Sequence, residues 1–231
     1  FRNIIINGDM SLAQRATSET GITNASGDVF VADRFCWSES GGMTSQFTMS
    51  QDTDVPAGYG FAKSLKLDCT TTDTPATTER IRIETRFEGQ NLQYLKKGTA
   101  NAESWTLSFW VKSVKTGTYI VNFRDEDNAR IVSKAYTISS ASTWEKKTIT
   151  VAPDTTDPFD NDNAHSLTIA WLLAAGSSLQ SGSLADVWQD YANANYAAGQ
   201  VNFADSTSNN FWITGVQLEA GTTASDFEFL P

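Results

Sequence analysis

The sequence Ser104-Trp-Thr-Leu-Ser-Phe-Trp-Val-Lys-Ser113 begins a block that ends at Val151 and decides the fold class. The block continues as Thr118-Tyr-Ile-Val-Asn-Phe-Arg124, then as Ile131-Val-Ser-Lys-Ala-Tyr-Thr-Ile138, and closes with Thr143-Trp-Glu-Lys-Lys-Thr-Ile-Thr-Val151. Each piece is rich in β-branched and aromatic residues and is bounded by residues that form turns. This pattern predicts consecutive β-strands.

Within these pieces, apolar residues occupy every second position. Leu107, Phe109 and Val111 alternate with Thr106, Ser108, Trp110 and Lys112, and Tyr119, Val121 and Phe123 alternate with Thr118, Ile120, Asn122 and Arg124. Successive side chains of a strand point to opposite faces, so each predicted strand has one apolar face. Residues 78–88 and 166–173 alternate in the same way. The chain therefore predicts a two-layer sandwich.

Composition and charge exclude several classes of protein. The 231 residues include 27 acidic and 17 basic ones, a net charge of −10, whereas nucleic-acid binding needs a basic footprint and anionic membranes attract basic segments. No apolar run approaches the roughly 20 residues of a membrane span. We therefore expect no nucleic-acid partner and no membrane insertion.

Cys36 and Cys69 are the only cysteines, and we expect two buried free thiols in preference to one disulfide bond. Two cysteines and the single histidine, His165, are too few for a zinc site. The chain begins at Phe1 without Met, so we expect a fragment or a processed piece of a longer protein.

No internal repeat and no Pro/Ser linker divides the chain. We therefore predict that residues 1–231 form one all-β domain, an antiparallel β-sandwich of jelly-roll type. Residues 177–210 are rich in Ser, Ala and Asn, and we expect a long surface insertion there. Trp171 and Trp212 are expected in the core, since they share parity with apolar neighbours.

The polar residues of the alternating strands form a candidate ligand-binding face. They share the outward parity on residues 78–88, 104–113 and 118–124: Arg82, Glu84, Arg86, Ser108, Trp110, Lys112, Asn122 and Arg124. If these strands are neighbours in one sheet, they form a polar surface with an indole in the middle. An aromatic ring stacks on the C–H groups of a sugar while arginine and amide groups bond its oxygens. The alternative is that the insertion covers Trp110.

Catalytic alternatives have weaker support. Arg82-Ile-Glu-Thr-Arg86 resembles a strand motif of jelly-roll polysaccharide lyases, which also need a Gln-x-His motif, while His165 lies in Asn-Ala-His-Ser. A ladder of salt-bridged charges explains the same residues more simply. A glycosidase with two carboxylates stays open, because the chain has many acidic residues.

Several segments together resemble a domain found in tail fibres and other virion proteins of bacteriophages. The resemblance lies in the segments Asn3-Ile-Ile-Ile-Asn-Gly-Asp-Met10, Gln14-Arg15, Ala32-Asp-Arg-Phe35, Leu107 to Lys112, Thr143 to Thr150, and Ile213 to Glu219 followed by Phe227-Glu-Phe229. It implies a jelly roll like a carbohydrate-binding module, carried on the virion and active outside the cell in attachment to host glycans. Related modules hold a structural Ca²⁺ near the paired termini. This similarity makes Asn7, Asp9 and Glu219 the candidate ligands.

We therefore expect a non-catalytic domain that binds a polysaccharide or another surface glycan. The first alternative is a polysaccharide lyase or glycosidase that acts on capsule or exopolysaccharide. The second is a structural assembly module whose exposed face packs against other virion chains, in a homotrimer if the fibre follows the usual symmetry.

Overall fold

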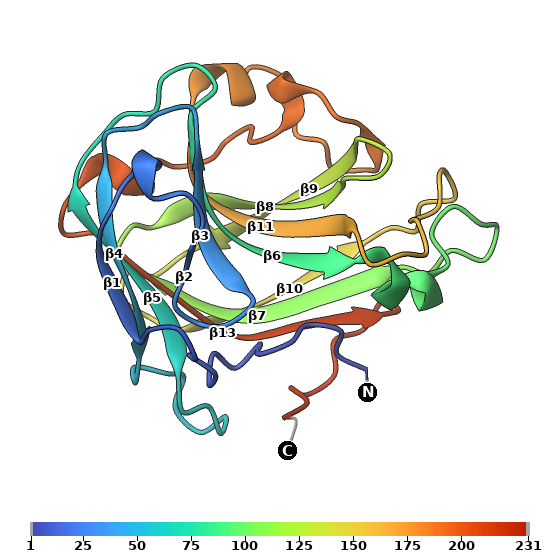
Figure 1. The fold of residues 1–231 in the computed structure, drawn as a ribbon, viewed down its shortest axis with the longest axis horizontal. Helices are drawn as coiled ribbons and strands as arrows, with labels where there is room; N and C mark the ends of the chain where they lie inside the picture. The colour runs from blue at the N-terminus through green and yellow to red at the C-terminus, as the bar shows by residue number, and fades with distance from the viewer. Residues whose placement is uncertain (1, 230–231) are drawn as a thin grey trace.

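Two antiparallel sheets packed face to face form the protein (Figure 1). The computed structural model describes residues 2–229. Sheet A has the strand order β1 (Ser18–Ile22), β4 (Gln46–Asp52), β5 (Ser64–Thr71), β13 (Asn210–Ala220), β7 (Trp105–Ser113), β10 (Glu145–Val151). Sheet B has the order β12 (Gln189–Asp190), β9 (Arg130–Ile138), β8 (Gly117–Asp125), β11 (His165–Ala175), β6 (Arg80–Glu88), β3 (Phe35–Ser40), β2 (Val29–Phe30). The predicted antiparallel sandwich of jelly-roll type is confirmed.

The core lies between the two sheets and follows the alternation of the strands. Phe109 on β7 meets Trp171 on β11 with ring centroids 5.7 Å apart, and Phe35 on β3 meets the same indole at 6.2 Å. Trp37 and Trp105 are also almost fully buried. Burying large aromatic side chains from both sheets removes much apolar surface from water, which is the main force that holds the layers together.

The block from 104 to 151 forms four strands, as predicted, but they do not stay in one sheet. β7 and β10 pair with each other in sheet A, while β8 and β9 pair with each other in sheet B. The chain therefore crosses from one layer to the other after Ser113 and crosses back before Glu145. This crossing decides where the candidate site residues lie.

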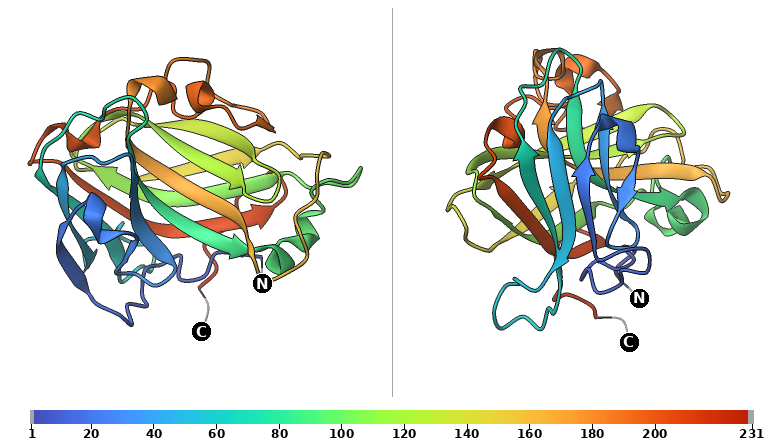
Figure 2. Two further views of the ribbon diagram at one scale, coloured as in Figure 1. Left: turned by 45° about the horizontal axis from the view of Figure 1, so that its top comes forward. Right: turned by 60° about the vertical axis from the view of Figure 1, so that its left-hand side comes forward.

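Three segments differ from what their residues predict: a strand at 2–6, an irregular segment at 11–24 and one strand at 29–37. Residues 2–6 are extended but form no strand; Ile4 N–H donates to Leu218 O (3.2 Å) and the segment runs beside β13 (Figure 2). Residues 11–24, expected to be irregular, contain β1. Residues 29–37 form two strands, because a turn from Ala32 to Phe35 separates β2 from β3.

The expected insertion covers part of the outer face of sheet B. Apolar side chains join it to the sheet: Ile120, Ile131 and Leu172 from the strands, and Leu179, Ala185, Tyr196 and Ala197 from the segment. Figure 1 shows this segment above sheet B, in orange. The long loop thus packs on sheet B through a small hydrophobic cluster of its own. Trp110 lies on sheet A and is not part of this cluster.

The helices are short 3-10 turns: η1 (Asn24–Ser26), η2 (Gly89–Asn91), η3 (Gln93–Leu95), η4 (Ser177–Leu179), η5 (Asn193–Asn195) and η6 (Phe203–Asp205). Within residues 2–229, no helix has the length and apolar character needed to span a bilayer. Cys36 and Cys69 are free and buried, which confirms the expected thiols.

Candidate functional site

The predicted ligand-binding face is divided between two opposite surfaces of the sandwich. Ser108, Trp110 and Lys112 lie on β7 in sheet A. The other five residues lie in sheet B: Arg82, Glu84 and Arg86 on β6, and Asn122 and Arg124 on β8. The prediction of a single surface is therefore wrong. Alternation along a strand tells which side chains face the core and which face outward, but it does not tell which sheet the strand joins. A ligand-binding role for each half stays a prediction.

On sheet A, Trp110 forms the base of an aromatic groove of about 290 Å³, which we call the Trp110 groove. The Trp110 ring is half-buried and packs against Tyr59 with centroids 4.4 Å apart and planes at 49°. Tyr59 is 55% exposed, and Phe229, which also lines the groove, is 46% exposed. The remaining lining residues are Gly58, Phe61, Ser108, Lys146, Gly215, Asp226 and Phe227.

Gly215 allows these rings to approach each other. Its φ is +62°, and a Cβ atom there would meet the Phe61 ring at 2.6 Å and the Trp110 ring at 3.1 Å. The pairing of β13 with β7 is also irregular between Thr214 and Gln217, as expected for a β-bulge. The groove therefore depends on a glycine at this position.

Lys112 lies farther along the same face and does not line the groove. It is 6% exposed; its Nζ lies 4.2 Å from the Trp212 ring centroid and 5.4 Å from that of Trp144. It also forms an ion pair with Asp54, which accepts a hydrogen bond from Trp144 Nε1 (2.9 Å). These contacts make Lys112 a support for two indoles. Trp212, expected in the core, lies half-buried on the outer face.

On sheet B, the three charged residues of β6 bind one another. Glu84 is 2% exposed and accepts hydrogen bonds from Arg82 and Arg86, and Arg86 also pairs with Asp28 (2.6 Å). Burial acts to lower the pKa of Arg86, but the negative charge of Glu84 outweighs it and raises the pKa. Arg82 donates a further bond to Ser40 Oγ (3.1 Å). The arrangement is the salt-bridged ladder that the sequence indicated.

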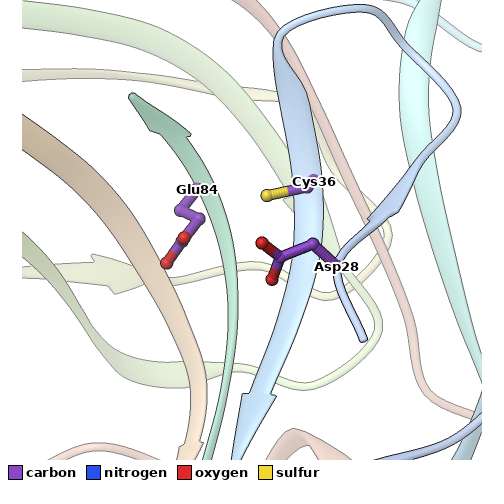
Figure 3. Close-up of side chains that lie close together, drawn as sticks. All are labelled: Asp28, Cys36 and Glu84. Carbon is purple, nitrogen blue, oxygen red and sulfur yellow. The ribbon is translucent and has the colours of Figure 1, made fainter. Parts of the chain in front are cut away.

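Cys36 on β3, Glu84 on β6 and Asp28, which immediately precedes β2, lie close together (Figure 3). Their ligand atoms lie within 4.8 Å of one another, and these residue types bind zinc. However, burial and the charge of Glu84 raise the pKa of the Cys36 thiol to about 12, and the thiolate is the form that binds metals. Both oxygens of Glu84 already accept bonds from arginines. The cluster does not fit a metal ion.

The two β8 residues of the predicted face are enclosed or paired. Asn122 is fully buried, and its Oδ1 and Nδ2 have no hydrogen-bond partner in the described part of the chain. Arg124 pairs with Glu126 (3.0 Å) and lies 5.2 Å from the Tyr191 ring centroid. Tyr191 belongs to the segment over sheet B. Neither side chain therefore offers an open surface to a large ligand.

The predicted calcium ligands use their oxygens within the chain. Asn7 Oδ1 accepts from Leu12 N–H (2.8 Å), and both oxygens of Glu219 accept bonds from Ser225 (2.6 and 3.0 Å). Asp9 Oδ1 accepts from Ser11 Oγ (3.0 Å). The side-chain oxygens of Asn7 and Glu219 thus already have donors, whereas Asp9 Oδ2 has none within residues 2–229. The calcium site stays a prediction.

Sequence reasoning found Trp110 and Ser108 but missed the walls of their groove. Tyr59 lies in Pro56-Ala-Gly-Tyr-Gly60, where a large aromatic residue among glycines is a signal of exposure. Phe227 and Phe229 belong to the segment that resembles phage proteins, but parity assigns no role to residues outside a strand.

No protein-family model and no curated protein matches this sequence. Among solved structures, the enzymatically active domain of tailspike protein 4 from bacteriophage CBA120 is 15% identical with a TM-score of 0.43, covering 87% of this chain and 21% of that chain. A family 4 carbohydrate-binding module is 13% identical with a TM-score of 0.45, covering 94% and 99%. A family 11 carbohydrate-binding module of a Clostridium thermocellum cellulase is 11% identical with a TM-score of 0.41, covering 91% and 99%. Likenesses this distant carry no argument about function.

Proposed function

We propose that this chain is a glycan-binding domain and that the sugar lies in the Trp110 groove. The observation that carries the proposal is the pair of partly exposed rings, Trp110 and Tyr59, on one outer face. Exposure of the apolar faces of such rings to water costs free energy, and a bound ligand that covers them removes this cost. The C–H face of a sugar can cover an aromatic ring in this way. The groove, about 290 Å³, is near the lower end of the range for small-molecule sites.

Polar groups along the groove are free to bind hydroxyl groups. Ser108 Oγ, Lys146 Nζ and the Asp226 carboxylate line it, and none of them has a side-chain hydrogen bond or ion pair within residues 2–229. A hydroxyl both donates and accepts, and so does a sugar. Stacking rings beside unsatisfied polar groups give both affinity and orientation.

The residues of the groove favour a domain that binds a glycan without cleaving it. Hydrolysis of a glycosidic bond uses two carboxyl groups on either side of the bond. Asp226 is the single carboxylate among the residues described as lining the groove. Incubation of the protein with a bound polysaccharide tests this point, because new reducing ends or unsaturated uronates would overturn it.

We further propose that the domain belongs to a phage tail or virion appendage and attaches the phage to a host. Its support is the sequence resemblance carried by residues 3–10, 14–15, 32–35, 107–112, 143–150, 213–219 and 227–229. Light scattering on the purified protein addresses the assembly alternative: a monomer at micromolar concentration argues against a trimeric structural module.

A glycan array tests the main proposal with Trp110→Ala and Tyr59→Ala. Truncating a central aromatic contact costs about 2 kcal/mol, or ~30-fold in affinity, so both variants should lose binding. Tyr94→Ala is the matched control, because Tyr94 is also an exposed tyrosine (43%) and lies away from the groove on η3. Retained binding by both groove variants would exclude this groove as the site.

A further inference from the structure

A second hollow, of about 500 Å³, lies where the turn before β3 meets β6. It gathers residues from separate parts of the chain: Ile6, Leu12, Gln14, Arg15, Phe30, Asp33, Arg34, Cys36 and Arg86. We call it the arginine pocket. Two of the segments that resemble phage proteins, Gln14-Arg15 and Ala32–Phe35, contribute its charges. Neither of these two segments lines the Trp110 groove.

The charge of the pocket is opposite to that of the chain. Three arginines line it against one carboxylate, Asp33, although the net charge of the protein is −10. Arg86 is compensated by Glu84 and Asp28. Among residues 2–229, Arg15 and Arg34 have no carboxylate oxygen within 4.0 Å. Two guanidinium groups are thus left without a counter-charge.

The backbone holds Arg34 in a costly conformation. Its φ is +72°, in the left-handed region that costs a residue with a Cβ roughly 1–2 kcal/mol. Three bonds maintain this turn: Phe35 N–H to Ala32 O (3.1 Å), Asp33 N–H to Leu12 O (2.9 Å) and the Asn7 amide to Asp33 O (2.8 Å). Strain that the surroundings enforce is concentrated at binding sites.

The same turn brings two like charges together. β3 and β6 pair with Phe35 opposite Thr85, so Arg34 and Arg86, the next residues of each segment, lie at the same end of this strand pair, and both line the pocket. Like charges gathered at one site are destabilising. The Arg15 guanidinium lies 4.8 Å from the Phe30 ring centroid, a cation–π contact that orients it. An anion between the arginines would remove the repulsion.

We propose that the arginine pocket binds an anionic sugar through its carboxylate or phosphate group, with Arg34 and Arg15 as the contacting residues. A guanidinium group offers two parallel N–H donors that match the oxygens of either anion. Ile6, Leu12 and Phe30 supply apolar walls for the ring of the sugar. The pocket is separate from the Trp110 groove, and the inference does not depend on sugar binding there.

Titration calorimetry at low salt tests the proposal with glucuronate, glucose 6-phosphate and inorganic phosphate, with glucose as the neutral blank. Each charge-assisted hydrogen bond contributes about 1.5–3 kcal/mol, so Arg34→Gln and Arg15→Gln should each weaken anion binding about tenfold or more. Arg34→Lys keeps the charge but removes the fork of donors, and should weaken binding less than Arg34→Gln. Circular dichroism and the melting temperature establish that each variant is folded.

Lys96→Gln is the matched control. Lys96 is an exposed cation with a positive φ (+53°) outside the pocket, so its substitution removes one charge at a similar backbone conformation, together with an exposed ion pair to Glu103 (2.7 Å). It should alter anion affinity less than twofold. The proposal is overturned if the wild type binds none of the three anions, if both arginine variants bind as the wild type does, or if Lys96→Gln weakens binding equally. Preference for glucuronate or for the phosphates identifies the anion.

Discussion

The side chain of Asn7 should contribute more to stability than its place near the N-terminus suggests. Asn7 is 7% exposed, and its Nδ2 donates to Leu12 O (2.9 Å) and to Asp33 O (2.8 Å). Its Oδ1 accepts from Leu12 N–H (2.8 Å). One amide thus joins the N-terminal segment to the turn that carries Arg34, and three substitutions separate its functions.

Asn7→Gly removes all three hydrogen bonds and tolerates the φ of +60°. At about 1 kcal/mol net for each bond, the free energy of unfolding should fall by about 3 kcal/mol. Asn7→Ala adds the cost of a Cβ in the left-handed region, roughly 1–2 kcal/mol, for a total of about 4–5 kcal/mol. Asn7→Asp keeps the acceptor but turns an oxygen toward two carbonyl oxygens, and should cost at least about 2 kcal/mol.

Urea unfolding followed by tryptophan fluorescence measures these values, because Trp37, Trp105 and Trp171 are nearly fully buried. For a chain of this size, 3 kcal/mol corresponds to a decrease of about 6–12 °C in melting temperature. Asn101→Gly is the control, since Asn101 is exposed and its side chain makes no hydrogen bond within residues 2–229.

Two results would refute the reasoning. A melting temperature of Asn7→Gly within about 1 °C of the wild type would show that the three bonds do not hold the turn. A wild-type protein stabilised by Ca²⁺, reversibly with a chelator, and an Asn7→Asp variant stabilised further, would favour the calcium site. The hydrogen bonds predict no effect of Ca²⁺ and a less stable Asp variant.

The remaining predictions concern acid stability and thiol reactivity. Burial acts to raise the pKa of Asp154, but hydrogen bonds from Arg130 and Thr156 N–H, with the charge of Lys97, lower it below 3.8. Its stabilisation is therefore present above pH 3.8 and lost as the pH falls through the lower folded pKa. Asp154→Asn should cost about 1–3 kcal/mol at pH 7, with a smaller difference from the wild type in acid unfolding curves; a constant difference would contradict this. Burial raises the pKa of Cys36 to about 12 and of Cys69 to about 11, so a thiol reagent at pH 8 should label them only after unfolding. Rapid labelling of the native protein would contradict the burial of the thiols.

The alternation of apolar residues was sufficient to predict strands and their inner faces. Leu107, Phe109 and Val111 are all buried in the core as expected, because a strand has period 2 and burial selects one parity. The charge ladder of β6 was also readable, since Arg82, Glu84 and Arg86 share one face and are close enough to pair.

Parity failed where the strand was irregular. Trp212 shares parity with its apolar neighbours Val216 and Leu218, which predicts that it faces the core with them. In β13 those two neighbours are buried while Trp212 faces outward beside Lys112. A bulge around Gly215 then changes the phase, because Thr214 and Gln217 pair with the outward residues of β7. An extra residue in a strand reverses the assignment of faces after it.

The tertiary structure alone decided which surface each candidate residue joins. β6 and β8 both pair with β11, whereas β7 pairs with β13 and β10, so Trp110 lies on the sheet opposite Arg82 and Arg124. Its partners Tyr59 and Phe229 come from loops distant in sequence. The sequence by itself determined the strands and their apolar faces, which depend on neighbouring residues. Sheet membership depends on pairing between distant segments, and no local pattern of side chains encodes that pairing.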